Sequence, residues 1–226
     1  MTVNHQFAEK LLLSIVRPDA MPADVHRVVT EAIRGGFAGV VVTPAYVARV
    51  ATLLRSENSP IELASVVGFP HGTGKSTLKA IEATSTIKDG ATAIHVVPFL
   101  PNLVRGDVDA AKAELIEIVR AARATRRDAI INVVIESALL MRRGGAGKGE
   151  ALVAAACRTA RESGCDGVVT NSGLQEAGGA SVQAIQIVRQ AGEGLTIVAA
   201  GGIRDVESAA MLLGSGGADR VVVDAD

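Results

Sequence analysis

The sequence predicts one α/β domain over residues 1–226, a (β/α)8 TIM barrel in which eight parallel strands close on themselves. Three observations predict this fold. The length of 226 residues suits such a barrel, which needs roughly 200–250 residues. Eight short apolar runs rich in β-branched residues recur along the chain. Between these runs the apolar residues shift to the 3.6-residue period of a helix, which is typical of strands covered by helices on their outer face.

The eight apolar runs are the predicted strands. They are Leu11–Val16, Gly39–Val42, Leu63–Val67, Ala93–Val97, Ile130–Ile135, Gly167–Thr170, Thr196–Ala199 and Arg220–Val223. Eight strands that alternate with seven helical segments favour a closed barrel over an open doubly wound sheet. An open sheet usually has five or six strands, and no glycine fingerprint for a dinucleotide follows the first run.

Two helical segments show the pattern most clearly. The first has an apolar stripe from Val25 to Ile33, with Pro22 near its start and Gly35 and Gly36 closing it, as expected for helix boundaries. The second lies between Val108 and Ala122. Its acidic residues come early and its arginines late, which suits the helix dipole.

Composition excludes several classes of protein. The net charge is −1 and aromatic residues make up 2% of the chain, which argues against a base-stacking nucleic-acid surface. No run of about 18 apolar residues occurs and the first residues do not form a signal peptide. Cys157 and Cys165 lack the spacing of metal ligands. We therefore expect a cytoplasmic protein that binds no nucleic acid, membrane, metal or cofactor.

The sequence ends at Asp226, directly after the eighth predicted strand. A barrel normally has a helix over this strand. We expect this wall to be covered either by a helix outside this sequence or by a partner subunit.

In a barrel of this kind the active site lies at the carboxyl ends of the strands and in the loops that follow. This rule selects the candidate residues. They are Ser14, Arg17, Thr43, Tyr46, His71, Lys75, His95, Glu136, Ser137, Thr170, Asn171, Ser172, Arg204, Asp224 and Asp226.

The segment from Gly68 to Thr77 contains Gly-Lys-Ser and invites comparison with a nucleotide-binding P-loop. The P-loop requires a glycine five residues before the Gly-Lys pair, so that backbone amides wrap the phosphates. That position holds Phe69, and Gly68 is one residue too far. We predict a glycine-rich loop between strand and helix, with Lys75 in solvent.

The segment Gly201-Gly202-Ile203-Arg204 follows the seventh predicted strand, and Asp205 is the predicted N-cap of the next helix. Exposed amides, a helix N-terminus and an arginine can together bind phosphate, and barrels often bind phosphate after strands seven and eight. Alternatively, the glycines only supply unusual backbone angles for a tight turn. Spacing alone leaves both interpretations open.

These residues also carry a resemblance to the deoxyribose-phosphate aldolase family. The matching segments are Arg17–Ala20, Phe37–Val40 with Pro44, Tyr46 and Val47, Val66–Pro70, Gly72 with Lys79, Glu82 and Ala83, Ile135–Ser137, Gly173, Gly178–Ala180 and Gly201–Arg204. The resemblance runs in order from about residue 11 to residue 223. It implies a barrel fold, a sugar phosphate as ligand, and Gly173, Gly201, Gly202 and Arg204 at phosphate-binding positions.

The resemblance also implies a reaction, the cleavage of 2-deoxyribose 5-phosphate to glyceraldehyde 3-phosphate and acetaldehyde. A lysine on strand six forms a Schiff base, a lysine on strand seven lowers its pKa, and an aspartate on strand four relays protons. The nucleophilic amine must be partly neutral, which requires the second cation and a desolvated pocket. In this sequence the three positions are Val169, Val198 and His95.

A shifted alignment does not restore these lysines. The chain has six, Lys10, Lys75, Lys79, Lys88, Lys112 and Lys148, and strands six to eight contain none. Asn132 replaces a further lysine of the family on strand five. Asp224 and Asp226 lie where the family has a small, hydroxyl-rich phosphate loop, and two carboxylates would repel a phosphate dianion.

Three functional hypotheses remain. In the first, Lys75 is a relocated nucleophile and His95 a general base near neutral pH. In the second, His95, Glu136 and Asp224 converge at the mouth as a lyase or isomerase of a small carbonyl compound, by proton transfer or with a divalent metal. Each of these three residues also has a purely structural interpretation. His95 is then a barrel histidine, Glu136 a structural residue, and Asp224 a cap at the chain end.

In the third hypothesis the chain is a non-catalytic homologue. It binds a sugar phosphate, or it supports an active homologue in an oligomer. The replaced catalytic set and the uncovered eighth wall both favour this hypothesis, so we expect either a homo-oligomer or a hetero-oligomer with an active homologue.

Overall fold

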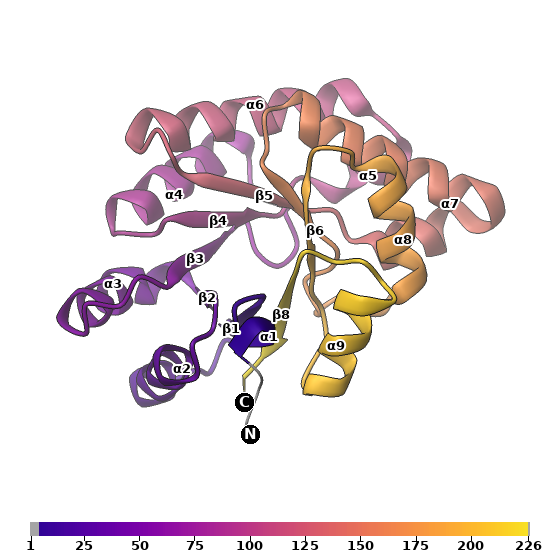
Figure 1. Cartoon of the computed structure of the whole chain (residues 1–226). Helices are drawn as coiled ribbons and strands as arrows, with labels where there is room; N and C mark the ends of the chain where they lie inside the picture. Colours follow the sequence, from indigo (N-terminus) through magenta and orange to yellow (C-terminus); the bar gives the residue numbers. More distant parts are fainter. Residues whose placement is uncertain (1–4, 226) are drawn as a thin grey trace.

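The computed structural model of the chain describes residues 5–225 and confirms the closed barrel. Eight parallel strands pair in chain order from β1 to β8, and β8 pairs with β1 (Figure 1). The strands are β1 Leu11–Ile15, β2 Gly39–Val42, β3 Glu62–Val67, β4 Ala93–Val96, β5 Ile130–Val134, β6 Gly167–Val169, β7 Thr196–Ala199 and β8 Arg220–Asp224. The predicted boundaries are correct to within one residue, and β8 extends to include Asp224.

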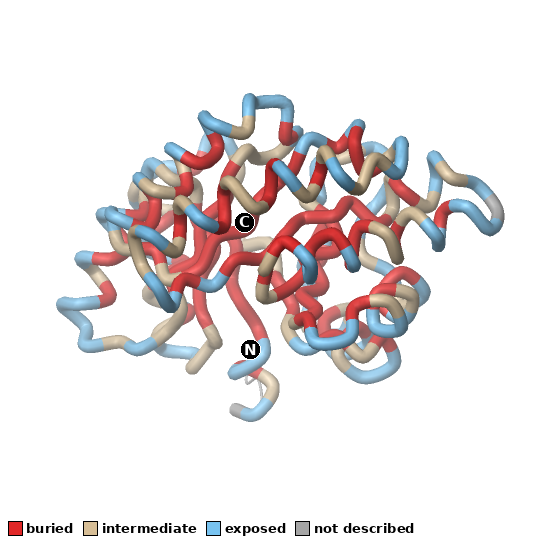
Figure 2. The backbone as a smooth tube through the Cα atoms, turned by 90° about the horizontal axis from the view of Figure 1, so that it is seen from above, coloured by how far each residue is buried: buried red, intermediate tan, exposed pale blue. Residues whose placement is uncertain are grey.

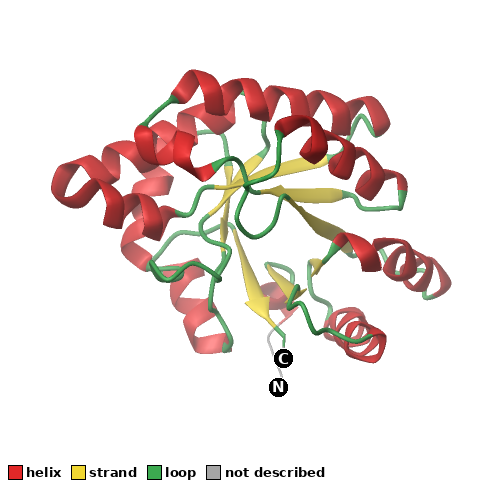
Figure 3. Cartoon of the chain, turned by 180° about the vertical axis from the view of Figure 1, so that it is seen from behind, coloured by secondary structure: helices red, strands yellow, loops and turns green. Residues whose placement is uncertain are grey.

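Helices form a ring outside the barrel, and the strands inside it are largely buried (Figures 2 and 3). Seven helices each follow one of the first seven strands. They are α2 Pro22–Gly35, α3 Val47–Ser56, α4 Ser76–Lys88, α6 Val108–Thr125, α7 Ser137–Glu162, α8 Val182–Ala191 and α9 Val206–Gly214. The short elements α1 His5–Ala8, η1 Pro44–Tyr46 and α5 Leu100–Arg105 complete the described secondary structure.

The predicted helix signals work as expected at both ends of α2 and at the start of α9. Pro22 is the first residue of α2, and Gly36 ends it in the left-handed conformation with φ of 65°. Asp205 is confirmed as the N-cap of α9, where its carboxylate accepts a hydrogen bond from the Ser208 amide at 2.7 Å.

One ion pair identifies the side chains that point into the barrel. Arg220 Nη1 lies 2.7 Å from Glu62 Oε2, although β8 and β3 are not neighbours in the sheet. Their side chains can meet only across the barrel interior. Directly paired residues of parallel strands share a face, and successive residues along a strand alternate. The interior face can therefore be followed from strand to strand.

This rule assigns the residues of interest. Val198 pairs with Arg220, and Val169 pairs with Val198, so both valines point into the barrel. His95 pairs with Val66, four residues beyond Glu62, and therefore points inward, as does its partner Asn132. Asp224, four residues beyond Arg220, faces the interior at the upper end of β8 and pairs with Ser14.

The eighth sector of the barrel differs from the others. Within residues 5–225 no helix follows β8, and β1 and β8 lie between α2 and α9 (Figure 1). The predicted site residue Asp226 lies outside the described residues. None of the described helices combines the length and hydrophobicity needed to cross a bilayer.

Candidate functional site

A pocket of about 190 Å³ opens at the carboxyl ends of β1, β6, β7 and β8. It brings together four predicted residues, Gly173, Gly202, Arg204 and Asp224. Its other lining residues are Ser14, Val16, Arg17, Pro18, Ser172, Leu174 and Ala225. We call this cavity the mouth pocket. It lies where the barrel architecture places ligands, beside the loops that follow strands seven and eight.

Two glycine loops meet at the mouth pocket. A Cβ atom on Gly173 would lie 3.1 Å from both Gly201 Cα and Gly202 N, so the loops after β6 and β7 are in direct contact. Gly173, Gly201 and Gly202 have φ of 83°, 108° and 75°, which residues with side chains rarely adopt. Gly201 is buried and its carbonyl accepts from Ala180 N, whereas Gly202 lines the pocket.

Hydrogen-bond donors are available here. Among the described residues, the amides of Gly173 and Gly202 have no acceptor, and the Arg204 guanidinium has neither a hydrogen bond nor an ion pair. The first turn of α9 already binds the carboxylate of Asp205, which lowers the pKa of that residue through hydrogen bonds from Ser208. An anion would therefore be held by the loop amides and Arg204 rather than by the helix N-terminus.

The other charged side chains at the mouth pocket do not favour binding of an anion. Arg17 is paired with Asp19 and Asp24, each at 2.9 Å, so its charge is largely neutralised. The Asp224 side chain faces the pocket from β8 and would repel a phosphate. Arg204 and Asp224 thus bring opposite charges to the mouth pocket.

The two lysine positions of the resembled family form an apolar pair. Val169 on β6 and Val198 on β7 are direct register partners, and each is only 2% exposed. Beside them the Thr170 hydroxyl donates to Ala200 O at 3.0 Å and accepts from Ala200 N. This part of the interior contains no amine.

None of the six lysines lines the mouth pocket. Lys75 lies exposed in the loop before α4, as predicted, and lines a separate surface pocket with Glu114 and Glu117. Lys79 is buried: its Nζ lies 2.6 Å from Glu114 Oε1 and 2.6 Å from Gly72 O.

Glu114 completes this buried contact by accepting a hydrogen bond from Phe99 N at 2.9 Å. The Lys79–Glu114 pair thus ties the loop after β3 to the loop after β4. We did not single it out from the sequence. The available signal was helical spacing, since Lys79 shares the buried face of α4 with Ala83 and Thr86.

His95 lies in the barrel interior beside Asn132 and does not line the mouth pocket. Burial lowers the pKa of His95 to about 4, and the positive charge of Arg220 contributes to the shift. The imidazole is therefore neutral at physiological pH and is not a cationic general acid there.

Hydrogen bonds of Glu136 and Asn171 link the segment after β5 to the loop after β6. Glu136, fully buried with φ of 52°, accepts from Ser172 N at 2.9 Å through Oε1. Asn171 Oδ1 accepts in return from Ala138 N at 3.0 Å. Glu136 Oε2 and Asn171 Nδ2 are buried without a partner among the described residues. Burial raises the pKa of Glu136, and the Ser172 hydrogen bonds and the charge of His71 oppose this.

The residues of the proton-transfer hypothesis do not share one cavity. Of His95, Glu136 and Asp224, only Asp224 lines the mouth pocket. Within residues 5–225 no three His, Cys, Asp or Glu side chains are grouped to hold a metal ion. Cys157 and Cys165 are buried free thiols, and burial raises the pKa of each to about 12.

Comparisons with known proteins agree with the predicted resemblance. Residues 7–218 match the model of the DeoC/LacD family aldolases. The chain is 35% identical over 204 residues to a deoxyribose-phosphate aldolase of Mycobacterium tuberculosis, covering 90% of this chain and 85% of that one. A deoxyribose-phosphate aldolase of Thermoanaerobacter is 31% identical over 209 residues, covering 92% and 88%.

Solved structures extend the likeness to the fold. A deoxyribose phosphate aldolase from Aeropyrum pernix, described as having a unique tetrameric structure, superimposes with a TM-score of 0.85 at 27% identity. The alignment covers 97% of this chain and 87% of that one. A putative deoxyribose-phosphate aldolase from Coccidioides immitis gives 0.84 at 25% identity, covering 97% and 82%.

Proposed function

The chain belongs to the DeoC/LacD aldolase family, and we propose that it binds a small sugar phosphate at the mouth pocket without performing Schiff-base cleavage. The observation that carries this proposal is the buried pair of Val169 and Val198. A Schiff base requires an amine that can reach the substrate carbonyl. A valine at each of the two lysine positions removes both the nucleophile and the cation that would lower the pKa of the nucleophile.

The remaining lysines do not replace this amine. Lys75 is exposed outside the mouth pocket, and Lys79 is held in its buried ion pair. A solvated lysine stays protonated near neutral pH and is a weak nucleophile. These placements support a protein that has kept the barrel and lost the covalent step.

Binding of a phosphate is supported by the donors that remain. Gly173, Gly202 and Arg204 line one pocket from two loops, and the two amides and the guanidinium have no acceptor among the described residues. Backbone amides in positive-φ turns form concave anion sites, and an arginine adds charge-assisted hydrogen bonds. Asp224 weakens this site, so we expect modest affinity and a preference for a singly charged phosphate ester.

The test is to incubate the protein with 2-deoxyribose 5-phosphate and sodium borohydride and to measure the intact mass. We expect no covalent adduct, together with saturable binding in a calorimetric titration that Arg204→Ala weakens. An adduct mapped to Lys75, or release of acetaldehyde, would overturn the non-catalytic proposal. Absence of any binding, with the protein folded, would overturn the sugar-phosphate ligand.

A proton-transfer reaction is the second candidate, and one observation favours it. Glu136 Oε2 is buried without a partner, and burial raises the pKa of this carboxyl. Glu136 does not line the mouth pocket itself, but Ser172, whose amide donates to it, does, and such a carboxyl can exchange a proton with a carbonyl compound that reaches it from there. In D2O, deuterium entering the substrate next to its carbonyl carbon, abolished by Glu136→Gln, would support this reaction. No exchange in the wild-type protein would exclude it.

The proposal has an assembly part as well. We propose that the chain associates with itself or with a lysine-bearing homologue, for which the tetramer described for the Aeropyrum protein is a precedent. Coexpression with such a homologue followed by copurification and sedimentation is the test. A homo-oligomer that is catalytically active by itself would contradict a supporting role.

A further inference from the structure

The mouth pocket presents two opposite charges to a ligand. Three charged side chains line it in the described chain, and they are Arg17, Arg204 and Asp224. Arg17 is held by two carboxylates, those of Asp19 and Asp24. Arg204 has no ion pair among the described residues, so it does not neutralise Asp224 although both line the same pocket. A ligand in this pocket therefore meets a cation and an anion of the protein at once.

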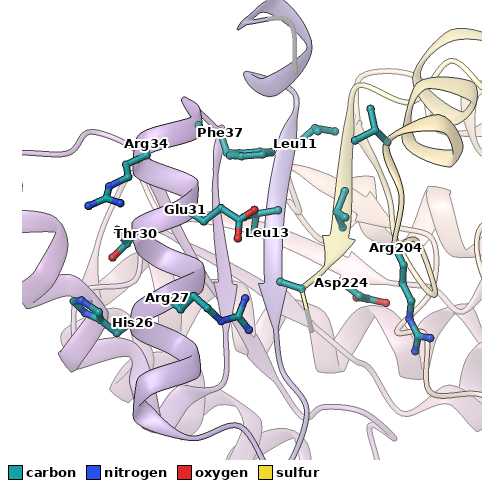
Figure 4. A pocket seen from close by; sticks show the side chains of 14 residues that line it. Leu11, Leu13, His26, Arg27, Thr30, Glu31, Arg34, Phe37, Arg204 and Asp224 are labelled. Atoms are coloured by element: carbon teal, nitrogen blue, oxygen red, sulfur yellow. The ribbon is translucent and has the colours of Figure 1, made fainter. Parts of the chain in front are cut away.

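Arg204 and Asp224 come from adjacent parts of the barrel. Arg204 lies in the loop after β7, and Asp224 is the last residue of β8. Figure 4 views both from the adjoining hollow between α2 and α9, whose lining they share, and the Asp224 carboxylate points to the side on which Arg204 lies. Because the two are not ion-paired with each other, one small molecule can contact both.

Ser14 adds a second hydrogen-bond acceptor beside Asp224. The two residues are direct register partners on β1 and β8, so their side chains leave the sheet on the same face. Ser14 is only 4% exposed and lines the mouth pocket, and its hydroxyl makes no hydrogen bond within the described chain. A hydroxyl accepts hydrogen bonds and a carboxylate offers about four acceptor sites, so both can receive hydrogens from one ammonium group.

The donors of the pocket lie on other elements than its acceptors. The amides of Gly173 and Gly202 and the guanidinium of Arg204 belong to the loops after β6 and β7, and none has an acceptor among the described residues. The acceptors Ser14 and Asp224 belong to β1 and β8. The pocket is thus divided into a part that favours an anion and a part that favours a cation. Its volume of about 190 Å³ limits the ligand to a small molecule.

We propose that the ligand of the mouth pocket is a small phosphate monoester that also carries an ammonium group. The phosphate contacts Gly173, Gly202 and Arg204, and the ammonium group contacts Asp224 and Ser14. This inference rests on the proposed function, because it adds a second charge to the phosphate ligand described there. An ammonium group compensates the repulsion between Asp224 and the phosphate, since it brings the opposite charge to the carboxylate. An amino sugar phosphate has both groups.

Other charge types fit the pocket less well. A neutral sugar phosphate leaves the carboxylate of Asp224 facing its phosphate without a counter-charge. A bisphosphate has two anionic ends, and one of them would lie against the acceptors. An amine without a phosphate would use Asp224 but leave the donors at Gly202 and Arg204 without an acceptor. Only a ligand with both charges uses both parts of the pocket.

The experiment compares two probes that differ in one group. O-phosphoethanolamine has an ammonium group two carbons from its phosphate, and 2-hydroxyethyl phosphate has a hydroxyl group at the same place. Calorimetric titration of the 226-residue chain near neutral pH and at constant ionic strength should show at least about tenfold tighter binding of the ammonium ester. The corresponding pair of three-carbon esters is titrated in parallel, because the separation of the two charges must match the pocket.

One substitution should act in opposite directions on the two probes. Asp224→Asn should weaken the ammonium ester about tenfold and strengthen the hydroxyl ester about threefold, whereas misfolding would weaken both. Asp109→Asn, which removes an exposed carboxylate on α6, should change neither. Arg204→Ala should weaken both esters, because both carry the phosphate. Circular dichroism checks the fold of each variant.

Equal affinity of wild type for the ammonium and hydroxyl esters, at both chain lengths, would overturn the inference. A preference for the ammonium ester that persists in Asp224→Asn would overturn it as well. In both cases phosphate binding that Arg204→Ala weakens would leave the proposed function standing. Absence of binding of every ester and of 2-deoxyribose 5-phosphate to the folded protein would instead overturn the proposed function, and this inference with it.

Discussion

Val169 on β6 and Val198 on β7 are register partners that point together into the barrel, each 2% exposed. The family resemblance places two lysines at these positions. Two ammonium groups here would repel each other and lose their hydration, at a cost that only a catalytic role explains. A pair of valines instead packs as part of an apolar interior. The two replacements therefore fit together. If only one lysine had been replaced, the other would remain as a buried charge with no catalytic role.

Restoring the amine should carry a measurable cost. Val169→Lys should lower the free energy of unfolding by about 3 kcal/mol, because it buries an ammonium group. The same burial should lower the pKa of the new lysine and make it reactive toward acetaldehyde. Chemical denaturation and borohydride trapping measure the two effects, with Val169→Met as the uncharged control. Full stability with a solvent-like pKa would show that this position is not desolvated.

His95 should make stability depend on pH. Its pKa of about 4 in the folded protein lies below the ordinary histidine value of 6.5, so the unfolded chain binds the extra proton between these values. The contribution of neutral His95 to the free energy of unfolding is fully present above pH 6.5. It is lost as the pH falls to 4, and the loss amounts to about 3 kcal/mol. The stabilities of wild type and His95→Gln, measured by thermal unfolding across this range, should converge at low pH. Parallel curves would contradict the burial of a neutral imidazole.

The Lys79–Glu114 pair should be a strong contributor to stability. Lys79→Met should cost about 3–5 kcal/mol, because it leaves the buried Glu114 without its counter-charge. The exposed Lys75→Met should change stability by less than about 0.5 kcal/mol. The double variant Lys79→Met with Glu114→Gln should recover part of the loss, and urea denaturation measures all three. An additive double variant would argue against a direct interaction.

Asp224 should limit the affinity for phosphate. Asp224→Ser removes the carboxylate from the mouth pocket and should strengthen binding of a sugar phosphate about three- to tenfold. Arg204→Ala should weaken it by a similar factor. Calorimetric titrations at constant ionic strength compare the variants. Unchanged affinity in both would place the phosphate outside the mouth pocket.

Glu136 should stabilise the fold through its hydrogen bond from Ser172, while its negative charge is unfavourable because it is buried. Glu136→Ala should destabilise the protein by about 1–3 kcal/mol, because it leaves the Ser172 amide without its acceptor. Glu136→Gln keeps an acceptor and should cost less. The pKa of Glu136 is raised on folding, so its contribution is present below the unfolded pKa and is lost as the pH rises through the folded value. The advantage of the glutamine variant should therefore grow with rising pH.

The barrel could be predicted because its signals are local. Apolar runs such as Gly39–Val42 and the helix signals at Pro22 and Asp205 each act within a few residues. The loss of the lysines is likewise readable from the sequence, since strands six to eight contain no lysine at any position.

The arrangement of the site could not be predicted in the same way, because it depends on residues far apart in the chain. Glu62 and Arg220 are 158 residues apart, and only barrel closure brings them together and identifies the inward faces. The low pKa of His95 follows from that closure, because desolvation depends on everything that surrounds a side chain. The sequence by itself determined the fold and the missing amine. Tertiary packing alone decided that Gly202 lines the pocket while Gly201 is buried, since two loops must meet before either can do so.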